Sequence, residues 1–178
     1  MKVGVISDTH IASSGFRKIS AQIITKVSDD IDSLKKLLEP SFKDAEAILH
    51  AGDLVDLAVI EMLEEFAPVY AVAGNMDPEP VRNALPAKRI VSLGKFSIGV
   101  MHGWGSPHGL SAKIREQFAG EKVDCIVFGH SHAAHNQIEE GVLMFNPGSP
   151  TDRRFAPKRT IGLLHLEDKI KGEHIEIN

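Results

Sequence analysis

The chain has 178 residues, a formal net charge of −4 and a hydrophobic share of 43%, which together favour a single folded domain over residues 1–178. That apolar share excludes intrinsic disorder, and the mild negative charge argues against a protein that binds a nucleic-acid polymer. No apolar run approaches the roughly 20 residues that cross a bilayer, and the single cysteine, Cys125, is typical of a reducing cytoplasm, where we expect the protein.

The first forty residues contain one predicted strand and one predicted helix. Lys2–Ile6 is a β-branched run that breaks into polar residues, which is typical of a buried strand that ends in a functional loop. Ile11–Val27 is irregular and polar, so we expect a long loop with no more than a helical turn. Asp29–Glu39 places its apolar residues on one helical face, and Pro40 is expected to end that helix.

The next segments continue the alternation of strand and helix. Ala45–Leu49 is a second short apolar run that ends in polar residues, Leu57–Phe66 has a helical pattern, and Val69–Ala73 is a third strand. A proline-rich stretch without a predicted element follows at residues 78–86.

The second half of the chain is rich in strands. One helix is predicted there, from the spacing of Leu110, Ile114 and Phe118. The strand-like segments are Ile90–Leu93, Phe96–Met101, Cys125–Phe128, Val142–Phe145 and Thr160–Leu166. An alternating first half and a strand-rich second half predict an α/β protein in which two packed sheets are covered by outer helices.

Five strands in succession end in residue types that bind metal ions. Loops at strand ends are where sites are assembled on a rigid scaffold, and alternate residues of an extended segment point the same way. Each motif alone is more often a polar turn than a set of ligands, but five independent turns do not explain the series. Neighbouring glycines permit tight turns and close backbone approach. The motifs are Asp8-Thr9-His10, Gly52-Asp53, Gly74-Asn75, His102-Gly103 and Gly129-His130-Ser131-His132.

This series resembles the calcineurin-like metallophosphoesterase superfamily. The closing Asn146-Pro147-Gly148-Ser149 and the small size resemble its stand-alone prokaryotic phosphodiesterases, and the resemblance runs from about Val3 to Ser149. It implies a four-layer α/β/β/α sandwich of two mixed sheets flanked by helices. It also implies that two divalent metal ions at the strand ends support hydrolysis of a small phosphodiester, in which a metal-activated hydroxide attacks phosphorus in line.

The resemblance assigns metal ligands motif by motif. The implied ligands are Asp8, His10 and His132 for one cation, Asn75, His102 and His130 for the other, and Asp53 as a bridge between both. Asp53, Asn75 and His102 are also the implied catalytic residues. Imidazole, carboxylate and amide oxygen suit Mn²⁺ first, with Ni²⁺, Fe²⁺ or Zn²⁺ as alternatives. Two such ions about 3.5–4 Å apart can clamp a phosphate and acidify a water.

Two departures from the family's pattern bear on the chemistry. Strongly catalytic members often carry G-N-H-[DE], whose histidine helps to protonate the leaving group, but this chain has Gly74-Asn75-Met76-Asp77. Methionine cannot transfer a proton, and Asp77 is expected to orient a neighbour or cap the turn. Relatives often have H-G-H after the fourth strand, whereas Trp104 follows Gly103 here, so the substrate side of the pocket should differ.

The remaining polar candidates are weaker. His50 is expected to be a satisfied buried histidine, and Cys125 a core residue. Candidates for the lining of the pocket are His108, His135 and the turn formed by Asn146, Gly148 and Ser149. Arg153 and Arg154 could meet a phosphate, although paired arginines more often form a solvated face. Structural or exposed positions are expected for His165 and His174.

Two rival functions stay open at this stage. One is hydrolysis of phosphomonoesters, and the other is a non-catalytic scaffold, because the superfamily includes a trafficking subunit with a degraded metal site. Competent residues at all seven implied ligand positions favour an enzyme. The sequence leaves the substrate and the oligomeric state open, and a homo-oligomer is compatible with it.

Overall fold

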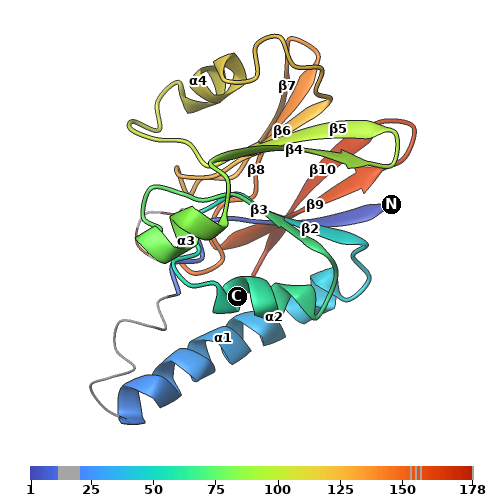
Figure 1. Cartoon of the computed structure of the whole chain (residues 1–178). Coiled ribbons are helices and arrows are strands. Elements are labelled where there is room, and N and C mark those ends of the chain that lie inside the picture. The colour runs from blue at the N-terminus through green and yellow to red at the C-terminus, as the bar shows by residue number, and fades with distance from the viewer. Residues whose placement is uncertain (12–20, 153, 155, 157, 178) are drawn as a thin grey trace.

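The structure, a computed structural model, describes residues 1–11, 21–152, 154, 156 and 158–177. Two five-stranded sheets pack face to face, with helices against their outer faces (Figure 1). This arrangement confirms the predicted α/β/β/α sandwich of two mixed sheets.

The first sheet has the strand order β10-β9-β1-β2-β3. Its central strands β1, β2 and β3 run parallel, and β9 runs antiparallel to both of its neighbours. The strands are β1 (Lys2–Ile6), β2 (Ala47–His50), β3 (Val69–Ala71), β9 (Thr160–Leu166) and β10 (Ile170–Glu176). Helices α1 (Ala21–Phe42) and α2 (Ala58–Glu64) lie beneath this sheet in Figure 1.

The second sheet has the strand order β4-β5-β6-β8-β7. Here β5, β6 and β8 run parallel, and the two edge strands run antiparallel to them. The strands are β4 (Lys88–Leu93), β5 (Phe96–Met101), β6 (Cys125–Phe128), β7 (His135–Glu139) and β8 (Val142–Asn146). Helix α4 (Leu110–Glu116) covers the outer face, and α3 (Glu79–Ala84) lies between β3 and β4 along the chain.

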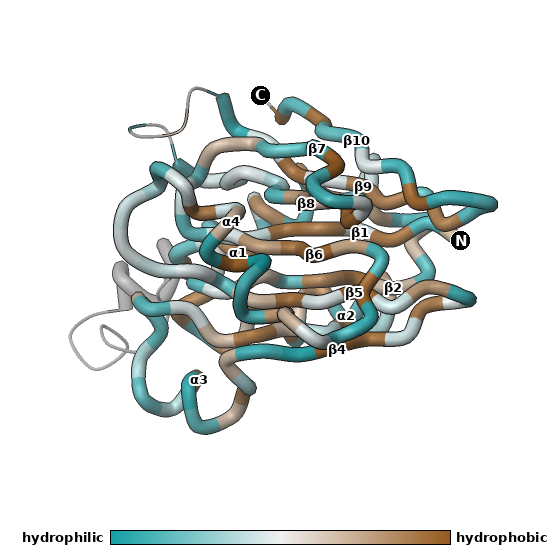
Figure 2. The backbone as a smooth tube through the Cα atoms, turned by 90° about the horizontal axis from the view of Figure 1, so that it is seen from above, coloured by the Kyte–Doolittle hydropathy of each residue, from teal (hydrophilic) through white to brown (hydrophobic). Residues whose placement is uncertain are grey.

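Three apolar clusters separate the four layers. Alternation along β1 sends Val3 and Val5 into the cluster between the two sheets, whereas Ile6 joins the cluster between the first sheet and helices α1 and α2. The third cluster joins Ile114 and Phe118 of the α4 region to the second sheet. In Figure 2 the central strands are accordingly largely brown, whereas connecting loops are largely teal. Apolar burial on both faces of each sheet is what holds the layers together.

The N-terminal half of α1 corrects one prediction. Residues 12–20 of the expected Ile11–Val27 loop lie outside the described residues, but the chain is already helical from Ala21. Pro40 does not end the helix, which continues to Phe42. Proline near the last turn removes a single intrahelical hydrogen bond, and the fully buried Phe42 ring, packed over Gly4 of β1, offsets that loss.

Three elements were not predicted. Helix α3 forms in the proline-rich stretch because Pro80 lies in its first turn, where a missing N–H costs nothing. Edge strands β7 and β10 carry mixed polar patterns with no strict alternation. Ends of the other elements differ from the predicted ones by a few residues. Among the described residues, no helix combines the length and apolar character that crossing a bilayer requires.

Candidate metal centre

The candidate ligands lie where the carboxyl ends of parallel strands meet. Asp8, Asp53 and Asn75 follow β1, β2 and β3, which point the same way. In the second sheet, His102 follows β5, and the G-H-x-H segment follows β6, which runs parallel to β5. Face-to-face packing of the sheets brings these two edges together, so the topology alone explains why segments far apart in sequence converge.

The backbone of the site is left-handed at most of its ligand positions. Five of the seven candidate ligands have φ between 49° and 72°, namely Asp8, His10, Asp53, His130 and His132. This backbone costs a non-glycine residue roughly 1–2 kcal/mol, and such strain clusters at functional sites. The predicted extended geometry of D-T-H and H-S-H is therefore wrong, because sharp turns, rather than strand alternation, aim the side chains.

One cluster combines Asp8, His10 and His132. Oδ1 of Asp8 lies 3.3 Å from Nε2 of His132 and 3.9 Å from Nε2 of His10, and the two imidazole Nε2 atoms are 3.2 Å apart. The other oxygen of Asp8 accepts hydrogen bonds from the hydroxyl of Ser7 and the N–H of His130. The three residues assigned to one cation are therefore brought together.

A second cluster combines Asp8, Asp53 and His102. Nδ1 of His102 donates to the carbonyl of Ala51 at 2.7 Å, which leaves Nε2 as a lone-pair donor directed at Oδ2 of Asp53, 3.1 Å away. This Nε2 atom is buried and has no hydrogen-bond partner among the described residues. A buried lone pair that faces a carboxylate fits a cation between them, so the donor set suits a divalent metal ion.

Asn75 and His130 face each other at the rim of the site. Nδ1 of His130 lies 2.9 Å from Oδ1 of Asn75, and Nε2 donates to the carbonyl of Gly105 at 2.8 Å. Both ring nitrogens of His130 thus face protein oxygens, and His130 belongs to neither cluster of candidate ligands.

The charges of the carboxylates shift the pKa values of the histidines. The hydrogen bond to Asp8 raises the pKa of His132 to about 9, against the opposing effect of burial, and Asp152 raises it further. Burial lowers the pKa of His102, but the nearby carboxylates of Asp53 and Asp8 outweigh burial and raise it. Burial likewise pushes the pKa of Asp53 up, and His102 outweighs that effect and holds it low. A cation entering the site therefore competes with protons.

Asp77 connects the loop after β2 to the loop after β3. Its buried carboxylate accepts hydrogen bonds from the backbone N–H groups of Asp53 at 3.1 Å, Gly74 at 2.7 Å and Val55 at 2.6 Å. Arg82 of α3 donates to its carbonyl. The expectation that Asp77 orients a neighbour is therefore confirmed.

His50 and the loop after β8 hold the first motif. Nδ1 of the fully buried His50 accepts from the N–H of Gly52, and Nε2 faces the hydroxyl of Thr9. Burial lowers its pKa to about 4, so His50 is neutral and satisfied, as predicted. Ser149 donates to the carbonyl of Asp8 at 2.8 Å, and Asn146 donates to that of Gly129 at 3.0 Å. The turn at 146–149 thus reaches the site.

Asp152, which the sequence analysis did not single out, contacts the candidate ligand His132. Its Oδ2 lies 2.5 Å from Nδ1 of His132, so the carboxylate sets the tautomer that leaves Nε2 facing Asp8. Gly52 shows a different constraint. It has φ of +92°, and a Cβ there would lie 2.8 Å from Nδ1 of His102. Only the proximity of Asp152 to the candidate ligands in the fold, and no spacing in the sequence, identifies it.

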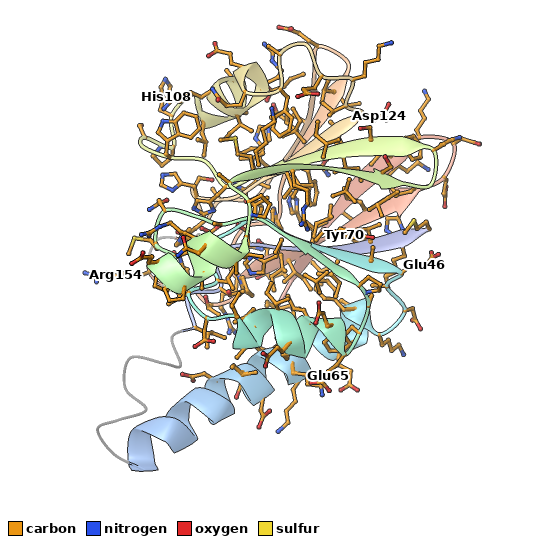
Figure 3. The ribbon with its side chains drawn as sticks, in the orientation of Figure 1. Glu46, Glu65, Tyr70, His108, Asp124 and Arg154 are labelled. Carbon is orange, nitrogen blue, oxygen red and sulfur yellow. The ribbon has the colours of Figure 1, made fainter. Side chains whose placement is uncertain are left out.

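Other predicted candidates lie away from these clusters. His108 and His135 line a separate cavity of about 320 Å³ beside Ser131, and His108 is exposed on the side of the molecule where Arg154 also lies (Figure 3). Arg153 lies outside the described residues. The structural positions expected for Cys125, His165 and His174 are confirmed, since Cys125 is buried, His165 pairs with Glu173, and His174 stacks on Phe145.

A cavity of about 800 Å³ adjoins the metal centre. His10 and His132 line it together with one face of α1 and the segment after β8. A second cavity, of about 340 Å³, is lined by Asn75, His102 and Arg82. The candidate ligands are therefore accessible from the surface on two sides.

Comparison with known proteins matches the chain to a family. A model of the calcineurin-like phosphoesterase superfamily domain matches residues 1–169. A probable metallophosphoesterase of Methanocaldococcus jannaschii is 34% identical over 178 residues, covering 99% of this chain and 82% of that protein. A phosphodiesterase of the same organism is 26% identical over 183 residues, covering 95% of each chain.

Solved structures share the fold. The solved structure of a protein described as a novel archaeal phosphodiesterase has a TM-score of 0.72 at 23% identity, covering 100% of both chains. Vps29 from Entamoeba histolytica, solved in complex with Zn²⁺, has a TM-score of 0.63 at 24% identity, also covering 100% of both chains. At these identities the likeness bears on the fold alone.

Proposed function

The chain belongs to the calcineurin-like phosphoesterase superfamily, and on that premise we propose that it hydrolyses phosphate diesters with two divalent cations, Mn²⁺ in the first place. One observation carries the proposal. The carboxylates of Asp8 and Asp53 converge in the interior on the Nε2 atom of His102, which has no hydrogen-bond partner among the described residues. A set of imidazole, carboxylate and amide donors suits borderline-to-hard cations.

The residues divide into two groups around Asp53. Oδ1 of Asp53 accepts the N–H of Met76 at 2.7 Å, so Oδ2 is left for ligation. This Oδ2 lies 3.1 Å from Nε2 of His102 and 3.8 Å from Nε2 of His10, which belong to different groups. The position of Oδ2 supports Asp53 as the bridging ligand. Asp8, His10 and His132 would complete one group, and Asn75, His102 and His130 the other.

When bound, the cations supply Lewis-acid chemistry, neutralising charge on the phosphoryl oxygens and lowering the pKa of a water. The chain contributes positioning. Asp152 fixes the tautomer of His132, and Ala51 fixes that of His102, so both imidazoles present Nε2 to the site. These second contacts restrict the ligands to one orientation before a substrate arrives.

The two rival functions are weaker on specific grounds. A scaffold has no need for competent donors, yet all seven ligand positions carry them, and five of them hold a costly left-handed backbone. A phosphodiesterase among the relatives and a cavity of about 800 Å³ beside His10 and His132 favour diesters over monoesters, because a diester has a second ester group to accommodate.

We also propose that residues 1–178 act as one domain in the cytoplasm on a small substrate rather than on a nucleic-acid polymer. The net charge of −4 gives no excess of cations for a polyphosphate backbone. The single cysteine is buried between the sheets, which is compatible with a reducing compartment.

The test compares a diester with a monoester after removal of metal. Chelator-treated protein should not hydrolyse bis(p-nitrophenyl) phosphate, added Mn²⁺ should restore the rate, and p-nitrophenyl phosphate should be cleaved more slowly. Asp53→Asn should abolish the restored rate, whereas Asp168→Asn, at a fully exposed position, should not. Full activity in verified metal-free protein would refute the metal mechanism, and a faster monoester reaction would favour the first rival.

A further inference from the structure

The cavity of about 800 Å³ beside the metal centre has walls from three parts of the chain. One wall is α1, which contributes Asp30, Ser33, Leu34 and Leu37, a spacing that places them on one helical face. His10 and His132 form the end at the metal centre. The third wall is the segment after β8, which includes Arg154 and Arg159. A group bound in this cavity would therefore lie beside the reacting centre.

Arg159 is the unusual residue of this lining. It is only partly exposed, and no hydrogen bond or ion pair joins its guanidinium to another residue in the described part of the chain. Its main chain is fixed, because its carbonyl accepts the N–H of Ile177 at 3.0 Å and it directly precedes β9. No guanidinium nitrogen of Arg159 is among the buried atoms without a partner, so its N–H donors reach the cavity and remain available to an acceptor that enters it.

The two acids of the lining do not fill that role. Asp152 lies against His132 and accepts hydrogen bonds from the N–H groups of Arg154 and Ala156. Asp30 is exposed on α1 and forms no ion pair with Arg159. The two carboxylates that line this cavity therefore do not supply an acceptor for Arg159.

We propose that Arg159 binds a second anionic group of the substrate, so that the natural diester carries a phosphate or carboxylate on one of its ester groups. Arg154 lies on the same wall and adds positive charge. Guanidinium groups suit such anions because they donate two parallel hydrogen bonds. Half-buried Leu37 lies outside the apolar clusters of the fold and would contact the organic part between the two anions.

This inference rests on the proposed function and names the substrate class of the same site. The test uses synthetic diesters with one p-nitrophenyl ester and one short alkyl ester, whose tail ends in a phosphonate, a carboxylate or a neutral hydroxyl. Because the leaving group is common to all three, differences in kcat/KM report the tail alone. Wild-type protein with Mn²⁺ should prefer an anionic tail by about tenfold to a hundredfold.

Arg159→Gln should remove that preference while leaving the rate on the neutral tail unchanged. Arg89→Gln, on β4 away from the cavity, is the matched control and should keep the preference. Binding of the alkyl phosphonate tail alone to chelator-treated protein, followed by calorimetry, should weaken about tenfold in Arg159→Gln. Circular dichroism and the thermal midpoint check that both variants fold.

The outcomes separate the two proposals. If no ester is hydrolysed with any cation but the tail still binds through Arg159, the proposed function fails and the anion site stands. If wild type and Arg159→Gln each hydrolyse the three diesters with equal kcat/KM, the anion site is overturned and the proposed function stands. A larger effect of the phosphonate than of the carboxylate would assign the anion as phosphate, and the reverse as carboxylate.

Discussion

Replacing Asp77 with alanine should destabilise the protein and weaken its metal site together. The carboxylate is 1% exposed and accepts three backbone N–H groups, from Asp53, Val55 and Gly74. Those donors belong to the two loops that carry Asp53 and Asn75. Removing the carboxylate leaves the donors without their acceptor and frees the loops from each other.

The magnitude follows from the number and type of bonds. A hydrogen bond to a charged group contributes roughly 1.5–3 kcal/mol, and water entering the space recovers part of it. We therefore expect Asp77→Ala to lower the free energy of unfolding by about 3–6 kcal/mol, a large part of a typical 5–15 kcal/mol. Asp77→Asn keeps one oxygen for the N–H groups of Asp53 and Gly74 but turns an NH₂ group toward Val55, so about 1–3 kcal/mol should be lost.

Urea unfolding of the metal-free protein measures the first effect, with Asp168→Asn as the exposed control. Calorimetric titration with Mn²⁺ measures the second on folded Asp77→Asn, whose affinity should fall because Asp53 is no longer fixed. An unfolding free energy of Asp77→Ala within about 0.5 kcal/mol of wild type, with Mn²⁺ affinity of Asp77→Asn unchanged, would refute the reasoning.

Three further predictions concern the ligands, the pH dependence and the leaving group. Asp53→Asn should lower the amount of bound metal at both positions, whereas Asp8→Asn should mainly lower it at one. Equal metal content in Asp53→Asn and wild type, measured by elemental analysis, would contradict the bridging role of Asp53. The pKa of His50 is about 4 in the folded protein and 6.5 in the unfolded chain, so the unfolded chain takes up a proton first as the pH falls. The free energy of unfolding should therefore decrease as the pH drops from 6.5 toward 4, and it should depend less steeply on pH in His50→Gln. Since Met76 cannot donate a proton, kcat/KM should rise steeply as the leaving group becomes more acidic. The Met76 side chain is 62% exposed, and Met76→His should accelerate hydrolysis of esters with poor leaving groups selectively. If kcat/KM does not change with the pKa of the leaving group while chemistry is rate-limiting, another acid acts.

The sequence predicts the layers and the ligand loops because both depend on local signals. Short apolar runs such as Lys2–Ile6 mark strands buried on both faces, and the polar residues that follow mark the loops. Where the local signal is weak, prediction fails. The edge strand His135–Glu139 has one large apolar residue, Ile138, and that side chain is exposed, so only pairing with β8 defines the strand.

The start of α1 and the contact made by Asp152 could not be predicted for another reason. Helical residues from Ala21 follow a segment whose polar composition resembles a loop, and the buried end at Phe42 lies beyond a proline. Asp152 contacts His132 only because the segment after β8 folds back over the ends of β1 and β6, which no spacing along the chain reveals. Arg159 was missed for the same reason.

A single physical principle connects the strained backbone to the contacts around it. Left-handed turns at Asp8 and Asp53 cost free energy, and they persist only where other contacts fix them. The fixing groups here, Asp77, His50 and Ser149, hydrogen-bond the main chain of the ligand loops rather than the ligand side chains. As a result the Nε2 atom of His102 and an oxygen of Asp53 stay without such partners and face each other across the position suited to a cation. Substitutions in the fixing groups should therefore change metal affinity without removing a single ligand atom.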